Sequence, residues 1–166
     1  QGLRELGISK LVMMTGDNEK TARSVAEAVG LTEFHAGVLP EDKANYIRAE
    51  HAAGRKVIML GDGVNDSPAL SEADVGIAIR DGAAIAREVA DITVGADNLY
   101  GLLTLKKLSD ALMARIHHNY RFIISFNFML ICLGVAGILP PATSALFHNA
   151  STLMISLRSM TNLLEA

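Results

Sequence analysis

The segment from Gly61 to Asp66 reads Gly-Asp-Gly-Val-Asn-Asp and concentrates residues that could hold a metal ion and a phosphate. Asp62 and Asp66 place two hard carboxylate ligands close together, and Mg²⁺ prefers such ligands. Asn65 offers an amide donor to a phosphate oxygen. The apolar run over residues 56–60 predicts a buried strand, and parallel α/β sheets bind ligands where their strands end. The pattern therefore predicts a magnesium and phosphate site.

A tight turn between two antiparallel strands would use the same Gly, Asn and Asp residues. Here the next residues are Ser67-Pro68 and a helical pattern, with no returning strand. Proline is tolerated at an early helical position because its missing N–H has no partner there in any helix. The sequence therefore favours a catalytic segment over a simple turn.

Two further segments supply groups that suit a phosphate. Thr15-Gly16-Asp17 ends another apolar run and precedes a helix, whose first N–H groups would point at an anion. Lys43 lies one turn inside a helix that begins at Pro40. Each has a plainer explanation when taken alone, either a helix N-cap or a solvated lysine. In chain order, however, a hydroxyl, an ammonium and paired carboxylates form a phosphoryl-transfer set.

The elements that must position these groups alternate between strand-like and helix-like segments, which is the pattern of a parallel α/β sheet. Gly30 and Gly54 each follow a helical segment, where glycine ends helices. We predict strands over 10–14, 34–39, 56–60, 75–79 and 92–94, with helices over 18–29 and 40–51, from 67, and near 83–89.

Three segments together resemble the P-type ATPases, a branch of the haloacid-dehalogenase-like superfamily. They are Met14–Asn18, Pro40–Lys43 and GDGVNDSPAL from Gly61 to Leu70, and the last is highly specific. The resemblance covers nearly the whole chain. It implies a Rossmannoid parallel sheet with helices on both faces, here over residues 1–96. It also implies ATP-driven transport through an aspartyl-phosphate intermediate.

By this resemblance, Asp62 is the Mg²⁺ ligand and Lys43 holds the phosphate. Thr15 and Asn65 would hydrogen-bond the phosphoryl group. ATP would bind mainly to domains that this chain lacks. Supporting roles fall to the carboxylates of Asp17 and Asp66 and to the cofactor-binding glycines Gly16, Gly61 and Gly63.

The phosphorylated aspartate of the family's Asp-Lys-Thr-Gly-Thr motif is absent from this sequence. The nucleotide-binding domain, the actuator's Thr-Gly-Glu loop and the earlier membrane helices are absent as well. We therefore expect the chain to be the C-terminal part of a longer polypeptide. It should be inactive alone and should need the rest of that polypeptide as its partner.

No Asp, Glu, Lys or Arg occurs from Phe122 to Leu157, a run of 36 residues. A membrane-crossing helix needs about 20 residues, so the run predicts two crossings within 122–160, joined by a Pro-Pro turn near 139–142. An amphipathic helix over 97–121 would connect this transmembrane helical hairpin to the α/β domain. Lys and Arg flank both ends, and the positive-inside rule places the α/β domain and both ends in the cytoplasm. We expect an integral protein of a bacterial plasma membrane, in contact with lipid.

Only two crossings after the catalytic domain resemble the heavy-metal subclass of the P-type ATPases. Polar residues at mid-membrane depth are costly and tend to be functional, so His148 and Asn127 are candidate ligands of the transported ion. Ser151, Thr152 and Ser156 share a helix face with His148, although such residues also pack membrane helices together. The His-Asn-Ala-Ser-Thr segment departs from the copper-pump pattern. A divalent Zn, Cd, Co, Mn or Fe ion is therefore favoured over copper.

Composition excludes some functions and leaves two alternatives open. The net charge of −3 at pH 7 and the lack of a basic run argue against nucleic-acid binding. Cys132 is the only cysteine, so no intramolecular disulfide can form. A soluble haloacid-dehalogenase-type phosphatase would share Lys43 and Asp62, but it has no use for the long uncharged run. An inactive membrane fragment is the other alternative, because the phosphorylated aspartate is missing.

Overall fold

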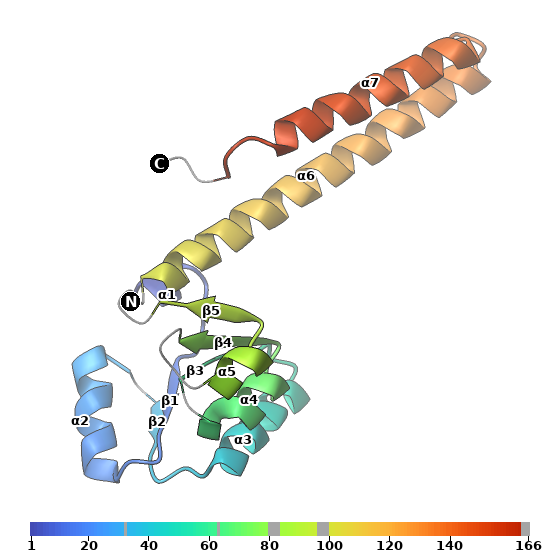
Figure 1. Ribbon diagram of the computed structural model, residues 1–166. Coiled ribbons are helices and arrows are strands. Elements are labelled where there is room, and N and C mark those ends of the chain that lie inside the picture. The colour runs from blue at the N-terminus through green and yellow to red at the C-terminus, as the bar shows by residue number, and fades with distance from the viewer. Residues whose placement is uncertain (32, 63, 80–83, 96–99, 164–166) are drawn as a thin grey trace. The chain divides into compact units, whose positions relative to one another are not determined.

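A computed structural model of the chain describes residues 1–31, 33–62, 64–79, 84–95 and 100–163 (Figure 1). The chain divides into two compact units, residues 1–103 and residues 104–166. Every strand of the described residues belongs to unit 1. Unit 2 consists of most of one long helix, a second helix and the turn between them.

The strands of unit 1 form two parallel sheets. In one, β1 (Val12–Met14) pairs with β2 (Glu33–His35). In the other, β4 (Val75–Ile79) lies between β3 (Ile58–Gly61) and β5 (Ile92–Val94). Every pairing is parallel, which confirms the predicted parallel α/β fold. The structure differs from the predicted single sheet because, among the described residues, no ladder joins β1 to β3.

Capping residues explain where the helices of unit 1 begin and end. The Asn18 side chain caps α2 (Glu19–Val29) by accepting a hydrogen bond from the Thr21 N–H at 3.0 Å. This helix ends at Gly30 in the left-handed conformation, with φ of 76°. Both α3 (Pro40–Ala52) and α4 (Ser67–Glu72) carry proline in their first turn. The other helical segments of unit 1 are α1 (Gly2–Glu5), α5 (Ala84–Val89) and the 3-10 turn η1 (Val64–Asp66).

Helices lie on both sides of these strands. α2 packs against β2, whereas α4 and α5 pack against β4, and α3 packs against α4 (Figure 1). Leu70 of α4 and Ala78 of β4 are fully buried and contact Met59 and Ala90. A Cβ atom on Gly76 would lie 2.6 Å from the Leu70 carbonyl oxygen, so α4 lies directly on β4. This close packing fixes the segment between β3 and β4, which carries the predicted phosphate site.

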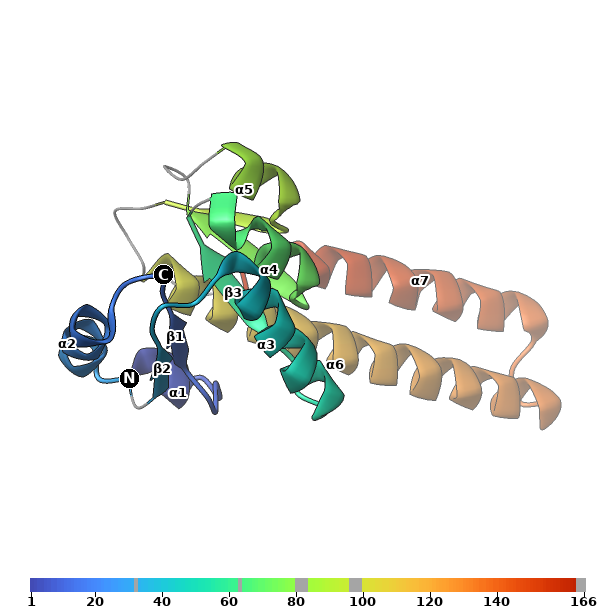
Figure 2. The same cartoon turned by 90° about the horizontal axis from the view of Figure 1, so that it is seen from below.

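Unit 2 is an antiparallel helical hairpin. Helix α6 (Gly101–Val135) is continuous across the boundary between the units, and α7 (Pro141–Ser159) returns alongside it (Figures 1 and 2). In the turn, Gly137 adopts the left-handed conformation with φ of 73°. Pro141 is the first residue of α7, where proline suits a helix. The turn therefore ends at Pro140, and Pro141 lies in the helix instead of the predicted Pro-Pro turn.

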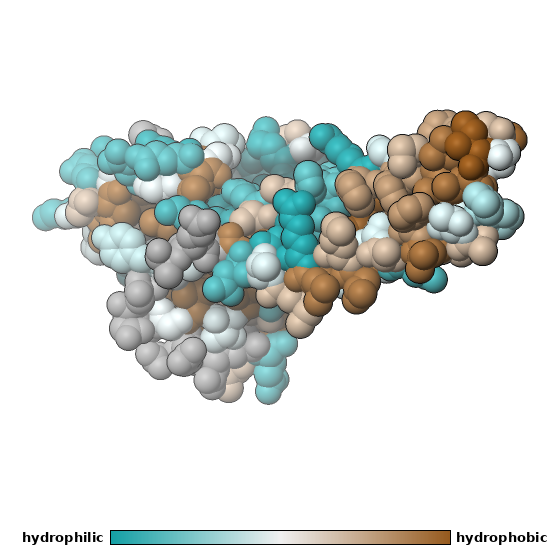
Figure 3. All heavy atoms as spheres, turned by 90° about the horizontal axis from the view of Figure 1, so that it is seen from above, coloured by the Kyte–Doolittle hydropathy of each residue, from teal (hydrophilic) through white to brown (hydrophobic). Residues whose placement is uncertain are grey.

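Large apolar side chains are exposed along the hairpin. Those of Phe128, Ile131, Val135, Leu146 and Leu153 are each more than 60% exposed. Figure 3 shows hydrophobic residues gathered toward the end of the hairpin that holds the turn. Within the described residues, no helix combines the length and the apolar character that a membrane crossing requires. The structure thus does not confirm the two crossings predicted over 122–160.

Candidate functional site

A buried ion pair lies at the end of β3. The Lys43 ammonium of α3 is 2.7 Å from Oδ1 of Asp66, and the two side chains are only 12% and 11% exposed. The second carboxylate oxygen of Asp66 accepts a hydrogen bond from the Asp62 N–H at 3.3 Å. The fold thus brings together three residues that the sequence predicted as one site, although 23 positions separate Lys43 from Asp66.

Gly61 permits this close approach. A Cβ atom at position 61 would lie 2.6 Å from Cβ of Asp66, far inside contact distance. The chain can therefore turn from β3 into η1 and direct the Asp66 side chain back under the strand end. Asp62 follows Gly61, Asn65 precedes Asp66, and both are exposed to solvent. Gly63, which the sequence predicts as a cofactor-binding residue, lies outside the described residues.

Thr15 and Asp17 form a second strand-end motif, after β1. The Thr15 hydroxyl donates to Asp17 Oδ2 at 3.0 Å and accepts from the Asp17 N–H at 3.2 Å. Since Asn18 caps α2, neither residue is needed as an N-cap, which removes the plainer explanation for their presence. Gly16 between them has room, because a Cβ atom there would lie 3.7 Å from the nearest atom, the Val38 carbonyl oxygen.

The Ser67 hydroxyl was not predicted as part of the site. Its oxygen is buried and has no hydrogen-bond partner among the described residues. A buried hydroxyl without a partner is unfavourable, so such groups in folded proteins are usually satisfied by water, an ion or another segment. Ser67 follows Asp66 directly, so this unsatisfied group lies next to the buried ion pair. Beyond that adjacency, no pattern in the sequence indicated it.

The donor set fits Mg²⁺, since Asp62 and Asp66 offer carboxylate oxygens at a strand end. The set is incomplete as it stands. No group of three His, Cys, Asp or Glu side chains within the described part of the chain is arranged to hold a metal ion. A magnesium ion here would take its remaining ligands from water, the phosphate or another part of the polypeptide.

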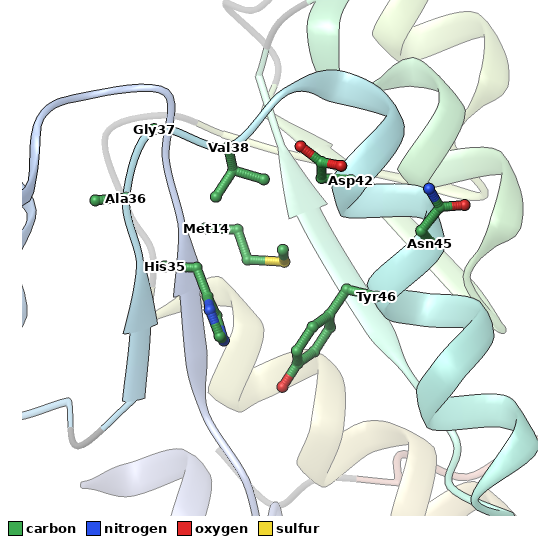
Figure 4. A pocket seen from close by; sticks show the side chains of 8 residues that line it. All are labelled: Met14, His35, Ala36, Gly37, Val38, Asp42, Asn45 and Tyr46. Carbon is green, nitrogen blue, oxygen red and sulfur yellow. The ribbon is translucent and has the colours of Figure 1, made fainter.

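A hollow of about 450 Å³ lies between the ends of β1 and β2 and helix α3 (Figure 4). In it the rings of His35 and Tyr46 lie next to each other, tilted by 56°, with their centroids 5.2 Å apart. Neither Lys43 nor Asp62 lines this hollow, so it is distinct from the predicted phosphate site. Its lining residues are Met14, His35, Ala36, Gly37, Val38, Asp42, Asn45 and Tyr46.

A polar cluster beside this hollow ties α3 to the strands. The Lys10 ammonium contacts the Tyr46 hydroxyl at 2.7 Å, Glu33 at 3.0 Å and Glu50 at 3.1 Å, and these contacts raise the pKa of Lys10. The Arg55 guanidinium also pairs with Glu50, and with Lys10 it lowers the pKa of Glu50 to about 2. Within the described residues these contacts link α3 to β2 and to Lys10.

In unit 2 the candidate ion ligands contact each other across the hairpin. Nδ1 of His148 lies 2.8 Å from the Asn127 amide oxygen. That oxygen can only accept, so Nδ1 carries a hydrogen, and in the neutral imidazole Nε2 then has the lone pair. The hydroxyls of Ser151 and Thr152 instead donate to the His148 carbonyl oxygen of their own helix. Ser156 likewise donates to the Thr152 carbonyl oxygen.

Comparison with known proteins identifies the class first. Residues 1–74 match the family of haloacid dehalogenase-like hydrolases. The chain is 40% identical over 154 residues to a zinc-exporting P-type ATPase of Mycobacterium marinum, covering 92% of this chain and 21% of that protein. It is 44% identical over 144 residues to a copper-transporting P-type ATPase of Rhizobium leguminosarum bv. viciae, covering 85% and 16%.

The fold agrees with this assignment. The chain superposes on the crystal structure of a zinc-transporting PIB-type ATPase with a TM-score of 0.87 and 32% identity. The match covers 99% of this chain and 26% of that one. Over nearly its whole length the chain is therefore similar to heavy-metal P-type ATPases, the family that its sequence resembles. It spans about a fifth of the length of the curated relatives that it matches.

Proposed function

We propose that this chain is part of an ATP-driven pump for a divalent transition-metal ion, in which unit 1 holds the phosphoryl group and Mg²⁺. The buried Lys43–Asp66 pair next to Asp62 carries this proposal. An ammonium at a strand end can hold a phosphate oxygen, and Asp66 fixes where that ammonium lies. A purely structural ion pair would gain little from such burial, since burial costs both ions much of their hydration.

Each predicted residue has a defined role in this proposal. Asp62 and Asp66 would hold Mg²⁺, which neutralises charge on the phosphoryl oxygens when it is bound. The Asn65 amide would donate a hydrogen bond to those oxygens. The Thr15 hydroxyl would do the same once its single hydrogen turns from Asp17 Oδ2 to the phosphoryl group, while the Asp17 N–H still holds the hydroxyl oxygen in place. The sequence contains no Asp-Lys-Thr-Gly-Thr segment, so the acceptor carboxylate would come from the remainder of the polypeptide.

The hairpin of unit 2 would lie in the membrane, with both of its ends in the cytoplasm. Its exposed apolar side chains support this, because a surface of this kind needs lipid or protein to cover it. The lysines and arginines that flank the uncharged run are those expected at a cytoplasmic boundary. Asn127 and His148 would face the remaining helices of the polypeptide.

His148 and Asn127 would contribute to the transport site. The hydrogen bond from Nδ1 to Asn127 fixes the imidazole tautomer and leaves Nε2 as a donor atom for a borderline divalent ion. The site would need further ligands from the rest of the polypeptide. Cu(I) prefers soft sulfur ligands, so this nitrogen donor favours Zn, Cd, Co, Mn or Fe over Cu(I), although some relatives are copper-transporting ATPases.

Two substitutions in the full-length protein test the two halves of the proposal. Asp62→Asn should abolish Mg²⁺-dependent ATP hydrolysis, whereas Glu27→Gln, an exposed carboxylate of α2, should leave it unchanged. Near-normal turnover in Asp62→Asn would refute the assignment of the magnesium ligand.

His148→Ala should weaken stimulation of the ATPase by its metal. Phosphorylation from inorganic phosphate should persist, because that chemistry belongs to unit 1. His117→Ala is the matched control, since His117 is exposed and contacts only the Met113 carbonyl oxygen of its own helix in the described structure. Assays over Zn, Cd, Co, Mn, Fe(II) and Cu(I) would identify the ion. Stimulation of the parent by Cu(I) alone would contradict the proposed divalent ion.

A further inference from the structure

Arg115 of α6 caps the C-terminal end of α7. Its guanidinium donates to three backbone carbonyl oxygens there: Ser159 at 3.2 Å, Thr161 at 2.6 Å and Asn162 at 2.9 Å. The last carbonyl groups of a helix have no partner within the helix and need one from elsewhere. Ser159 is the last residue of α7, and Thr161 and Asn162 follow it. A side chain 44 positions earlier in the sequence therefore binds the last carbonyl of the helix and the segment directly after it.

The chemistry of arginine suits this position. Its planar fork carries several N–H donors in fixed directions, so one side chain can bind several carbonyl oxygens at once. A positive charge is also favoured at a helix C-terminus, where the helix dipole is negative. One turn further along α6, the Asn119 amide donates to the Ser159 hydroxyl at 3.0 Å, and Arg158 contacts His118 at 3.3 Å. These contacts join the same two helix segments.

The contacts of Arg115 and those of His148 define one register. Asn127 lies 12 residues after Arg115, about 18 Å along α6 at 1.5 Å per residue. His148 lies 11 residues before Ser159, about 17 Å along α7. The two cross-helix contacts thus lie about three turns apart on each helix and fit the same alignment. A slip of α7 by one turn, about 5.4 Å, would break both.

We propose that Arg115 is a positioning residue for transport: by capping α7, it holds the hairpin in the register that keeps His148 opposite Asn127. This inference rests on the proposed role of His148 and Asn127 in binding the ion. Arg115 touches neither residue, so it would act only through the alignment of the two helices. Metal affinity would then depend on a residue about 18 Å along α6 from the transport site.

The test compares Arg115→Gln, Arg115→Lys and Arg121→Gln in the full-length protein. Arg121 is exposed on the same helix and makes no hydrogen bond or ion pair in the described part of the chain. Arg115→Gln should raise the metal concentration that half-activates the ATPase by about tenfold or more, as loss of supporting contacts does at other metal sites. Arg115→Lys keeps the positive charge but lacks the planar guanidinium, so its half-activating metal concentration should lie between those of the unsubstituted protein and Arg115→Gln. Arg121→Gln should leave the half-activating concentration unchanged. Phosphorylation from inorganic phosphate should be unchanged in all three variants.

A second measurement reports the register without relying on activity. Asn119→Cys and Ser159→Cys are introduced together with Cys132→Ser, because Cys132 is exposed and could compete. The 119–159 disulfide is quantified by mass spectrometry of the linked peptide. It should form several-fold more slowly with Arg115→Gln than with Arg121→Gln. Once formed, it should restore metal activation of Arg115→Gln.

The proposal is overturned if Arg115→Gln leaves the half-activating concentration unchanged, or raises it without slowing cross-linking. If no metal ion stimulates the ATPase activity of the unsubstituted full-length protein, the proposed function is refuted instead. In that case, cross-linking at an unchanged rate would still overturn the role of Arg115 in setting the register, and slower cross-linking would support it.

Discussion

Replacing Lys43 with methionine removes one ion of the buried Lys43–Asp66 pair while nearly preserving side-chain volume. Asp66 then remains 8% exposed as a residue, without the ammonium 2.7 Å from its Oδ1. Removal of one partner from a buried ion pair costs about 3–5 kcal/mol, because the buried charge that is left loses its counter-ion. Asp66 keeps the hydrogen bond from the Asp62 N–H, so we expect the lower end of this range, about 3 kcal/mol.

The control lies on the same helix and uses the same kind of pair. Arg48 of α3 pairs with Glu72 of α4 at 2.9 Å, but these side chains are 59% and 31% exposed. Exposed pairs contribute about 0–1 kcal/mol, so Arg48→Met should have little effect. Both pairs link α3 to the segment around α4. The difference in stability loss between Lys43→Met and Arg48→Met therefore measures the effect of burial.

Native-state hydrogen exchange in magnesium-free buffer measures the difference. A loss of about 3 kcal/mol in opening free energy corresponds to exchange roughly 150-fold faster in peptides that cover α3, β3 and α4. The double variant Lys43→Met/Asp66→Asn should lose much less than the sum of the two single variants, because no buried charge is left. Equal effects of Lys43→Met and Arg48→Met, or additive losses in the double variant, would refute this reasoning.

Three further results are expected. The contacts of Glu50 with Arg55 and Lys10 hold its pKa at about 2, below the ordinary 4.5, so its stabilising contribution is complete above pH 4.5 and is lost as pH falls toward 2. Acid unfolding of Glu50→Gln should therefore depend less on pH in that window. Gly61→Ala should destabilise unit 1 by about 1–3 kcal/mol through its clash with Asp66, whereas Gly16→Ala, which has room, should not. A cysteine at position 141 should react with an impermeant thiol reagent only from outside the cell, and labelling only from the cytoplasmic side would contradict the proposed topology.

The strand ends of unit 1 were predictable because they depend on local patterns. Apolar runs followed by Thr-Gly-Asp or Gly-Asp-Gly mark the ends of β1 and β3, and the structure has both strands there. The helices that begin at Pro40 and Ser67 were also predictable, because proline favours a first helical turn. Strand lengths were not predictable, since a strand ends where its pairing ends. The predicted strand covers residues 34–39, whereas β2 covers residues 33–35.

The partners of individual charges could not be predicted. Lys10, Lys43 and Arg48 look alike in the sequence as basic residues of the α/β domain. In the fold, Lys43 pairs with Asp66 in a buried position, Lys10 joins a cluster around Tyr46, and Arg48 forms an exposed pair. Which of these charges is buried depends on how α3 packs on α4 and the strands, and no local pattern encodes that packing. The order of the motifs indicated Lys43 as the phosphate-binding lysine, and of these three basic residues it is the one whose ion pair is buried.

The same distinction applies to the hairpin. Its polar residues were identifiable because they interrupt an uncharged run, but the pairing of His148 with Asn127 depends on the register of two helices. The register depends on where α7 begins, and therefore on Gly137 in the turn and on Pro141 as the first helical residue. It also depends on the far end of α7, where Arg115 holds three carbonyl oxygens. A single residue inserted in the turn would rotate α7 by about 100° and carry His148 away from Asn127, because an α-helix has 3.6 residues per turn. Turn length and the Arg115 cap therefore constrain the same pairing from opposite ends of the helix.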